Sequence, residues 1–593
     1  MKLVVPHTGE VEAADARLIR LAEFLGVRCA PLLLAKKVQQ RAEYIERMVP
    51  DQNSCLVINP RVMREWVGED VLPAEWVSSL VLRFRYVLVH ALTLHPFVTS
   101  MVATVSGGKL QSVQPIADIG QPYEISSNSK DICGPFSGIS FGPINPGNDR
   151  VFAASADDPA VRDLICIGGR PHMAAVKRGK MEILFLASED TADVNAEISG
   201  EPLRNYFSRL MPYAMALRYI FGEECWHPSK AHASIIIDDP LLRRDYGYLN
   251  FESLLRLMER YNFHTTISFI PLNYRRNSAR IIRMFRENAH RLSICFHGND
   301  HTQAELASTD TAILNRTLGI AEERMKAHEQ VTGLHCDRVM VFPQDNYSVE
   351  AMEVLKSRNF HAASSSPNPV GNAVPLRIAD LAQPAVLRYG GMPLFIRNFI
   401  RATQSQDIAF NLFFGRPLLI GEHHDTFKHP GPLIEVVQKI NSIAPGISWS
   451  NLESVADNST LKRRRPDGTV EVRPYSRNVL IANDSASVGR FSIEWGQFGR
   501  CPPIEQVLRD GTRFPGVEFD DTGIRLLAEL PPGASQLFSL VYRNTHAALG
   551  NPGFIWDAKA FLRRRLSEVR DNYLSKNQHV LTAAKTLQRR FLR

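Results

Sequence analysis

The chain has 593 residues, of which 44% are apolar and 22% are charged, the composition of an ordinary globular protein with roughly three or four domains. Its formal net charge of +7 comes entirely from residues 551–593, which hold ten Lys or Arg and three Asp or Glu. Because the rest of the chain is neutral, the composition argues against a nucleic-acid partner.

Neither an export signal nor a membrane-spanning helix is expected. The first residues lack the basic start and the long apolar run of a secretory signal. The most apolar stretch, residues 77–105, contains Arg83 and Arg85, which a membrane helix would not tolerate. The eight cysteines form no C-x-x-C pair and are expected to be thiols in a reducing compartment. We therefore expect a cytoplasmic protein.

Residues 1–200 alternate short apolar runs with helical patterns, which is typical of an open α/β sheet. The predicted elements are strands at 2–5, 55–58, 86–89 and 181–186 and a helix at 12–25. No phosphate-binding glycine motif is present, so we assign this domain no chemistry. A linking segment, 201–227, follows with a helix at 204–221.

Residues 228–458 repeat a β-α pattern, which predicts a distorted (β/α) barrel. The predicted strands are 234–237, 265–270, 292–296, 339–342, 361–364 and 417–422. The predicted helices are 251–261, 278–287, 303–329, 349–358 and 433–441. Residues 367–411 are too long for a connecting loop and are interpreted as a lid or an insertion.

Two smaller regions complete the chain. Residues 465–546 change to strand patterns separated by turns, which predicts a β-sandwich. Residues 551–593 carry apolar side chains at helical spacing, and one basic amphipathic helix is predicted over 558–592. Such a helix is expected either to bind an anionic membrane or an acidic protein, or to pack on its own protein.

Polar side chains follow the strands of the predicted barrel, where the chemistry of such folds lies. Asp238 and Asp239 end the first strand, and two adjacent carboxylates there need a cation or a shared proton. His297 and His301 follow the third strand, and Gly298 allows the turn that brings both imidazoles to one point. Two imidazoles and a carboxylate are a typical ligand set for one divalent ion, with Zn²⁺ expected.

Other candidates lie at the same edge. Pro343 and Gln344 follow the fourth strand, and backbone N–H groups after Pro343 are expected to stabilise an oxyanion. After the second strand, Asn273 and Arg275 reach the mouth and are expected either to contact substrate or to begin a solvated helix. Thr302 and Glu305 fit a capping box, which predicts that a helix begins just after His301.

The order of these motifs resembles the NodB-type polysaccharide deacetylases, carbohydrate esterase family 4, over about residues 231–430. The resemblance rests on Asp238-Asp239, His297-x3-His301, the stretch 338–343 and His423-His424. It implies a distorted (β/α) barrel and metal-dependent removal of N- or O-acetyl groups from glycans, with a carbohydrate as substrate. It further implies Asp239, His297 and His301 as the metal ligands.

The resemblance also implies the groups that move protons. Asp238 would be the general base that takes a proton from water, and Arg338 would orient it. A late histidine would return a proton to the leaving nitrogen. Strand alternation puts His423 and His424 on opposite faces, so either remains a candidate for this acid.

The sequence departs from the family pattern at three places. Gly298 stands where the family usually has Ser or Thr, and Pro343 is followed by Gln344-Asp345 instead of an aromatic residue and glycine. The D-x-x-x-W motif is not evident near 360–371. Two alternatives therefore stay open: a metal-dependent amidohydrolase acting on a non-glycan substrate, and a non-catalytic scaffold of polysaccharide biosynthesis. The intact Asp and His pairs argue against the scaffold.

Overall fold

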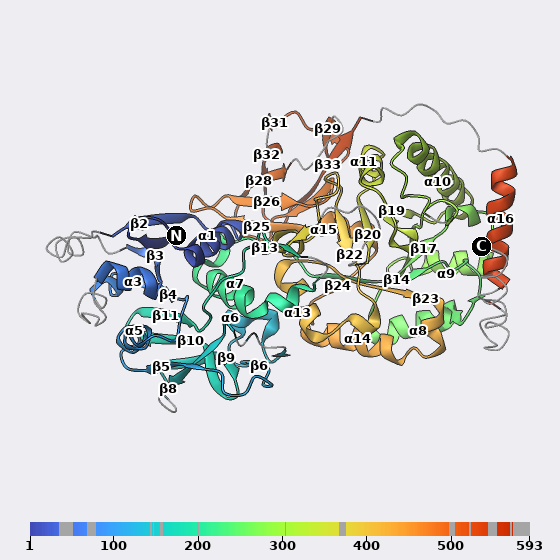
Figure 1. Cartoon of the computed structure of the whole chain (residues 1–593). Helices are drawn as coiled ribbons and strands as arrows, with labels where there is room; N and C mark the ends of the chain where they lie inside the picture. Colours follow the sequence, from blue (N-terminus) through green and yellow to red (C-terminus); the bar gives the residue numbers. More distant parts are fainter. Residues whose placement is uncertain are drawn as a thin grey trace. The chain divides into compact units, whose positions relative to one another are not determined.

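The computed structural model describes a mixed α/β protein with several sheets (Figure 1). The described residues are 1–34, 51–67, 79–142, 145, 147–154, 158–198, 201–302, 304–366, 375–496, 504–520, 523–543, 554–569 and 572. They divide into two compact units. Unit 1 comprises Met1–His227, Leu376–Ala382 and Arg463–Gly468, and unit 2 comprises Pro228–Pro375, Gln383–Lys462 and Thr469–Arg593.

Unit 1 is built on a nine-stranded sheet whose first five strands are parallel. In spatial order these are β2 (Cys29–Leu33), β1 (Lys2–His7), β3 (Asp51–Ile58), β4 (Phe84–Val89) and β11 (Met181–Leu186). The four predicted strands are confirmed within β1, β3, β4 and β11, and the predicted helix is α1 (Ala13–Phe24).

The other half of this sheet is antiparallel, which the alternating pattern did not predict. Its strands are β10 (Arg170–Arg178), β9 (Val161–Ile167), β6 (Tyr123–Ile125) and β7 (Ser140–Phe141). The predicted linking helix is α7 (Phe207–Phe221), and nearly all of its side chains are buried. It is therefore part of the core of unit 1.

Unit 2 contains a series of seven neighbouring parallel strands. In spatial order they are β23 (Leu418–His423), β14 (His232–Asp238), β17 (Thr265–Phe269), β18 (Leu292–Phe296), β19 (Cys336–Val341), β20 (Ala362–Ser365) and β22 (Leu394–Ile396). Asn398, just after β22, bridges to Ile420 of β23, so the two ends of the series meet.

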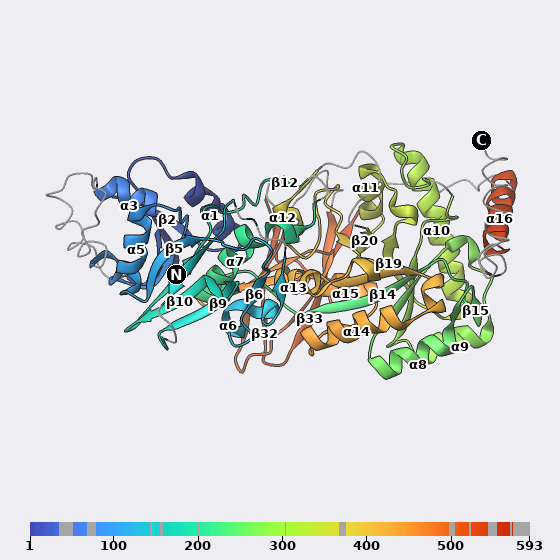
Figure 2. The same ribbon diagram turned by 60° about the horizontal axis from the view of Figure 1, so that its bottom comes forward.

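Helices surround these strands in both ribbon views (Figure 1, Figure 2). They are α8 (Phe251–Tyr261), α9 (Ala279–Glu287), α10 (Thr311–Thr332), α11 (Val349–Ser357), α13 (Ser405–Phe414), α14 (Gly431–Ile443) and α15 (Leu452–Asn458). The strands are buried on both faces, as the run Ile235-Ile236-Ile237 in β14 illustrates.

Two boundaries differ from prediction. The helix expected just after His301 begins only at Thr311, where Asp310 accepts hydrogen bonds from the first turn. The segment interpreted as a lid or an insertion, 367–411, instead contributes β22 and α13. Residues 367–374 of that segment lie outside the described residues. A strand of three residues such as β22 is too short to be recognised from an alternating pattern.

The later part of unit 2 holds two sheets that share one hydrophobic cluster. One includes β26 (Val470–Pro474), β28 (Gly489–Gly496), β32 (Gly523–Leu530) and β31 (Val517–Asp520). The other consists of β27 (Asn478–Ala482), β33 (Ser535–Tyr542), β29 (Ile504–Arg509) and β30 (Thr512–Arg513). Side chains from both sheets, Val479 and Phe491 among them, fill the space between them.

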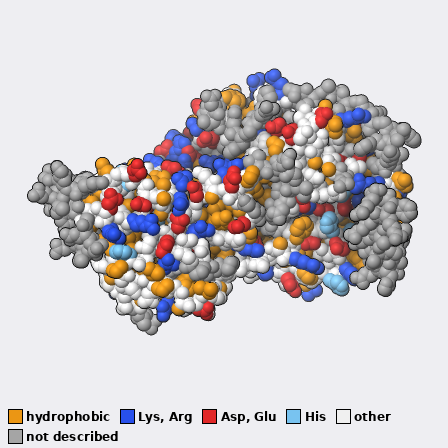
Figure 3. Space-filling model, in the orientation of Figure 1, with side chains coloured by type: hydrophobic (Ala, Val, Ile, Leu, Met, Phe, Trp, Pro, Cys, Tyr) orange, Lys and Arg blue, Asp and Glu red, His pale blue; other side chains and the backbone are white. Residues whose placement is uncertain are grey.

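The described part of the tail is one helix, α16 (Phe554–Val569), together with Asn572. The rest of the predicted helix, 570–571 and 573–592, lies outside the described residues. Across the described ranges, no helix has both the length and the apolar character needed to cross a membrane. Acidic and basic side chains are interspersed on the face drawn in Figure 3, as expected for a nearly neutral body.

Candidate metal centre

Three of the predicted side chains meet at the carboxyl ends of the strands. The Nε2 atoms of His297 and His301 lie 3.8 and 3.6 Å from Oδ1 of Asp239. The two imidazole rings are 4.9 Å apart between centroids. Asp239 follows β14, and His297 follows β18. The three ligand atoms are close enough to one another to bind a single ion.

The loop that carries both histidines is held by Glu305. Its carboxylate accepts hydrogen bonds from the backbone N–H groups of Asn299, Asp300 and His301, at 3.2, 3.1 and 3.0 Å. The predicted capping box assigned Glu305 to a helix start, and the structure corrects this, because the carboxylate satisfies the N–H groups of the loop instead. Glu305 therefore acts as the internal support of the histidine loop.

This arrangement requires glycine at position 298. Gly298 has φ +63°, and a Cβ added there would lie 1.9 Å from Oε1 of Glu305 and 2.7 Å from Cγ of Pro343. Serine or threonine, the usual residues of the resembled family, would collide with both neighbours. The departure seen in the sequence is thus coupled to the use of Glu305.

The backbone at the site is strained. Asp239 and His301 have φ values of +81° and +58°, and Gln344 and Asp345 have +57° and +52°. Such left-handed conformations of residues other than glycine cost energy and cluster at functional sites.

The protonation of the site suits metal binding. Nδ1 of His297 donates to the carbonyl oxygen of Val341 at 2.8 Å, which leaves the lone pair of Nε2 facing Asp239. Burial lowers the pKa of His297 to about 4, so the imidazole is neutral near pH 7. The buried Oδ1 of Asp239 has no hydrogen-bond partner among the described residues. Two imidazoles that face a carboxylate oxygen without a hydrogen bond fit a divalent cation such as Zn²⁺.

Asp238 is fully buried beside this centre and is held as a carboxylate. Nη1 of Arg397 donates to both of its oxygens, at 2.9 and 2.7 Å, and the hydroxyl of Ser268 donates to Oδ1. Burial by itself would raise the pKa of Asp238, but Arg397, together with His297, His423 and the hydroxyl of Ser268, outweighs it and holds the pKa below its usual value. Arg397 directly follows β22, the short strand that pattern analysis missed.

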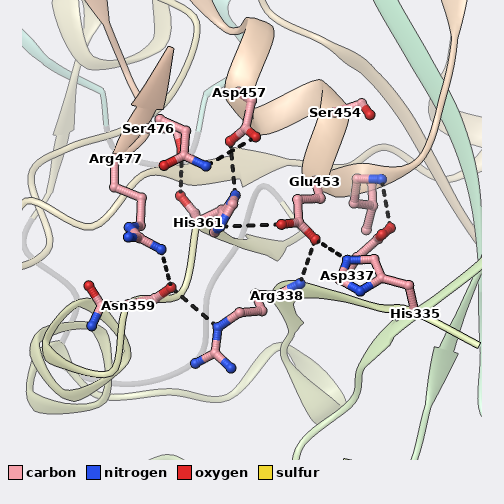
Figure 4. A network of polar contacts seen from close by, with 12 residues as sticks. His335, Asp337, Arg338, Asn359, His361, Glu453, Ser454, Asp457, Ser476 and Arg477 are labelled. Atoms are coloured by element: carbon pink, nitrogen blue, oxygen red, sulfur yellow. Dashed lines mark hydrogen bonds and ion pairs between the residues drawn. The ribbon is translucent and has the colours of Figure 1, made fainter. Parts of the chain in front are cut away.

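The arginine that contacts Asp238 is thus Arg397 and not the predicted Arg338. Arg338 lies near the beginning of β19, whereas the candidate site lies at the strand ends. Its Nη2 contacts Glu322 at 2.5 Å and the carbonyl oxygen of Arg358 at 2.6 Å. Figure 4 shows it in a separate polar network with Asn359. An arginine at the start of a strand cannot reach a group at its far end.

The side chains of His423 and His424, at the end of β23, point to different sides. His423 is the register partner of Asp238 across β14 and β23, so both side chains leave the same face of the strands. His423 is exposed, and its charge also acts to lower the pKa of Asp238. His424 is buried, with its ring edge-on to Tyr246 at 5.2 Å. The structure therefore brings His423, rather than His424, beside the aspartate pair.

The turn after Pro343 also reaches the site. Oδ1 of Asp345 accepts from the backbone N–H of Ser366 at 2.9 Å and lies 3.4 Å from Nη2 of Arg397. Asp345, which the sequence interpretation did not select, therefore positions the arginine that holds Asp238. Gln344 is exposed next to it.

The two remaining candidates are engaged with neighbours. Asn273 is buried and accepts a hydrogen bond from Arg276 at 3.1 Å. The guanidinium of Arg275 stacks over the ring of Tyr274, 4.9 Å from its centroid. These contacts are local to the segment after β17, and a substrate contact by either residue stays a prediction.

One residue of the tail helix was not expected at the site. Nη2 of Arg564 in α16 donates to the carbonyl oxygen of Asp239 at 2.8 Å, and Nη1 lies 3.6 Å from its Oδ1. The sequence interpretation counted Arg564 only as part of the basic face of a helix. No local signal relates it to Asp239, because the two residues are 325 positions apart.

No protein-family model and no curated protein matches the chain. Among solved structures, the carbohydrate deacetylase Agd3 is similar at 8% identity and a TM-score of 0.46, covering 91% of this chain and 98% of that one. The Xyl-CE4 domain of a multidomain xylanase from the hindgut metagenome of Trinervitermes trinervoides has 13% identity, a TM-score of 0.23 and coverage of 38% and 89%. The Bc1960 peptidoglycan N-acetylglucosamine deacetylase has 15% identity, a TM-score of 0.24 and coverage of 39% and 90%.

Proposed function

We propose that the chain is a metal-dependent hydrolase that removes acetyl groups from an N-acetylated or O-acetylated glycan or glycoconjugate. The observation that carries the proposal is the arrangement of two carboxylates with different surroundings. Asp239 faces two imidazoles with an unsatisfied oxygen, while Asp238 is held ionised by Arg397. We interpret the closed series of parallel strands around them as a distorted (β/α) barrel.

Asp239, His297 and His301 would hold one divalent ion, with Zn²⁺ as the expected metal. When bound, such an ion polarises the acyl carbonyl and lowers the pKa of a water molecule. The ligand atoms come from two strand ends and a loop fixed by Glu305, so the site is preorganised.

Side chains next to the ligand set would transfer the protons. Asp238 is the general base, since a carboxylate with a lowered pKa is ionised and can accept a proton at neutral pH. Arg397 holds the carboxylate of Asp238 in its orientation. His423 is the general acid of this proposal, because it is exposed on the same side as Asp238 and can return a proton to the leaving nitrogen. The backbone N–H of Gln344 is the candidate oxyanion donor.

The test measures acetate release by the full-length protein from a panel of N-acetylated and O-acetylated oligosaccharides, after metal removal and after addition of Zn²⁺. We expect release that depends on the metal and is lost in Asp238→Asn. Acetate release that is identical with and without metal, or in Asp238→Asn, would contradict the proposal. A panel of acetylated non-glycan amides, run in parallel, separates glycan specificity from general amidohydrolase activity.

We propose in addition that α16 binds an anionic membrane surface through its outer face. Leu562, Leu566 and Val569 are exposed on this face, and the exposed Arg563 and Arg565 flank it. Apolar side chains bordered by arginines match a surface of acidic lipid head groups. We expect Leu562→Ser/Leu566→Ser to reduce binding to vesicles containing phosphatidylserine, and binding of the unaltered protein to weaken with salt. Equal vesicle binding by both proteins would exclude this surface.

A further inference from the structure

Along residues 562–569, whose side chains the structure describes, the buried face of α16 is charged and the exposed face includes large apolar side chains, the reverse of an ordinary surface helix. Arg564 and Glu568 are 5% and 7% exposed, whereas Leu562 and Leu566 are 62% and 64% exposed. The described inner face is thus held by polar contacts. Along this described stretch, undocking exposes charged groups and no hydrophobic core, and charged groups are readily solvated by water.

Three residues of the described tail attach it to the strand-end region through polar contacts. The guanidinium of Arg564 donates to the carbonyl oxygen of Asp239 and, at 3.1 Å, to the hydroxyl of Tyr246. Glu568 forms a two-point ion pair with Arg276, one contact of which is 2.6 Å. One turn later, Oδ1 of Asn572 accepts from the backbone N–H of Gly247 at 2.8 Å. These residues recur at i, i+4 and i+8, which is one face of a helix.

The charge of Arg564 is directed at the candidate metal centre itself. Its Nη1 lies 3.6 Å from Oδ1 of Asp239, the same oxygen that the Nε2 atoms of His297 and His301 face. The guanidinium therefore neutralises the carboxylate that would otherwise be compensated by a metal ion. A divalent cation and a guanidinium on one carboxylate oxygen repel each other strongly, since the pair is shielded from water.

We propose that Arg564 is an internal counter-ion of Asp239 that a divalent cation must displace, so that α16 is a lid whose docking and metal binding oppose each other. The proposal rests on the metal site of the proposed function. Linkage makes the opposition reciprocal: α16 weakens metal binding by the same factor by which the metal weakens docking of α16. The lid would keep the site closed until metal is present.

The first test compares Zn²⁺ affinity of the metal-stripped full-length protein and its Arg564→Gln variant, by competition with a chromophoric chelator. We expect Arg564→Gln to bind Zn²⁺ roughly tenfold more tightly, a typical size for coupling between sites. Arg563→Gln is the matched control, because it removes the same charge from the exposed side of α16 and should leave the affinity unchanged. Equal affinities in the two variants, or weaker binding by Arg564→Gln, would overturn the proposal.

A second variant distinguishes the effect of releasing α16 from the effect of removing the charge of Arg564. Glu568→Gln breaks the ion pair with Arg276 without touching Asp239, so it should also tighten Zn²⁺ binding by releasing the helix. If only Arg564→Gln tightens binding, the effect is electrostatic and the lid is contradicted.

The reciprocal test measures hydrogen exchange of the α16 amides. Zn²⁺ should accelerate exchange in the unaltered protein, whereas Arg564→Gln should exchange rapidly with or without metal. Slower exchange after addition of metal would overturn the lid. Failure of the two proposals can be distinguished: if no variant binds Zn²⁺, the metal site is wrong, and if all bind it with one affinity, only the lid is wrong.

Discussion

Two clusters of histidine and carboxylate lie at opposite edges of the same series of parallel strands. The first, with Asp239 at its centre, lies where β14 and β18 end. The second surrounds Glu453 of α15 and lies where β19 and β20 begin (Figure 4). Both contain groups whose ligand atoms are close enough for a metal ion. Residue type and proximity therefore do not distinguish them.

The difference lies in how far their polar atoms are satisfied. In the Glu453 cluster, His335 contacts Glu453 at 2.8 Å and His361 contacts Asp457 at 2.9 Å. Asp337 accepts from the backbone N–H of Leu452 at 3.0 Å. These groups already compensate one another, as in a structural network.

In the Asp239 cluster, by contrast, Oδ1 has no hydrogen bond within the described chain, and the backbone of Asp239 and His301 is strained. Nη1 of Arg564 lies 3.6 Å from this oxygen but makes no hydrogen bond to it, so the oxygen can still accept a ligand. This comparison favours the strand-end cluster as the proposed ligand site and the Glu453 cluster as a structural support.

The largest expected effect is on metal content. His297→Ala should lower Zn²⁺ affinity by at least about 100-fold. Losing a direct ligand costs more affinity than losing a residue that only hydrogen-bonds to a ligand. His335→Ala, in the other cluster, should bind Zn²⁺ like the unaltered protein. Metal analysis after dialysis measures both. Full occupancy in His297→Ala together with loss in His335→Ala would reverse the assignment of the two clusters.

The next effect separates the two aspartates. Asp238→Asn should retain the metal and lose turnover by about 10²–10⁴-fold, because an amide cannot accept the proton. Asp239→Asn should instead lose metal affinity. Metal titration and acetate release, measured on both variants, give opposite patterns if the roles are assigned correctly. Loss of metal in Asp238→Asn with retention in Asp239→Asn would exchange them.

A smaller effect compares two arginines through stability. Arg397→Met leaves the buried Asp238 without its cation and should lower the free energy of unfolding by about 3–5 kcal/mol. Arg338→Met removes a partly exposed ion pair with Glu322 and should cost roughly 1 kcal/mol or less. Urea unfolding measures both. Equal losses would mean that the ion pair between Asp238 and Arg397 stabilises the fold no more than an ion pair near the surface does.

The smallest effect is a pH dependence that belongs to the Glu453 cluster. Hydrogen bonds to Glu329 and Glu453 raise the pKa of His335 to about 10, from about 6.5 in an unfolded chain. The contribution of His335 is therefore fully present below about pH 6.5 and is lost as pH rises toward 10. Because the side chain is 65% exposed, solvent screening keeps this contribution small.

Thermal unfolding between pH 6 and 10 tests this dependence. His335→Gln should flatten the decline of Tm with pH, and Arg563→Gln, away from the cluster, should leave it unchanged. A decline of the same slope in His335→Gln would show that other groups cause it.

Prediction from sequence succeeded where a strand and its chemistry are neighbours. Asp238 and Asp239 directly follow three β-branched residues, and His297 directly follows β18, so the rule that parallel strands carry their polar ends to one edge was enough to bring them together. It failed for Glu305, whose capping pattern fits a helix start equally well, because the same carboxylate can satisfy N–H groups of a helix or of a loop.

By itself, the sequence determined which residues are the candidates for the ligand set, since their identity and order depend on short local patterns. Only the tertiary structure decided what surrounds the two aspartates. Arg397 reaches Asp238 from 159 positions away, and Arg564 reaches Asp239 from 325. Contacts at such separations follow from the order of strands and the docking of a helix, for which a single sequence carries no local pattern.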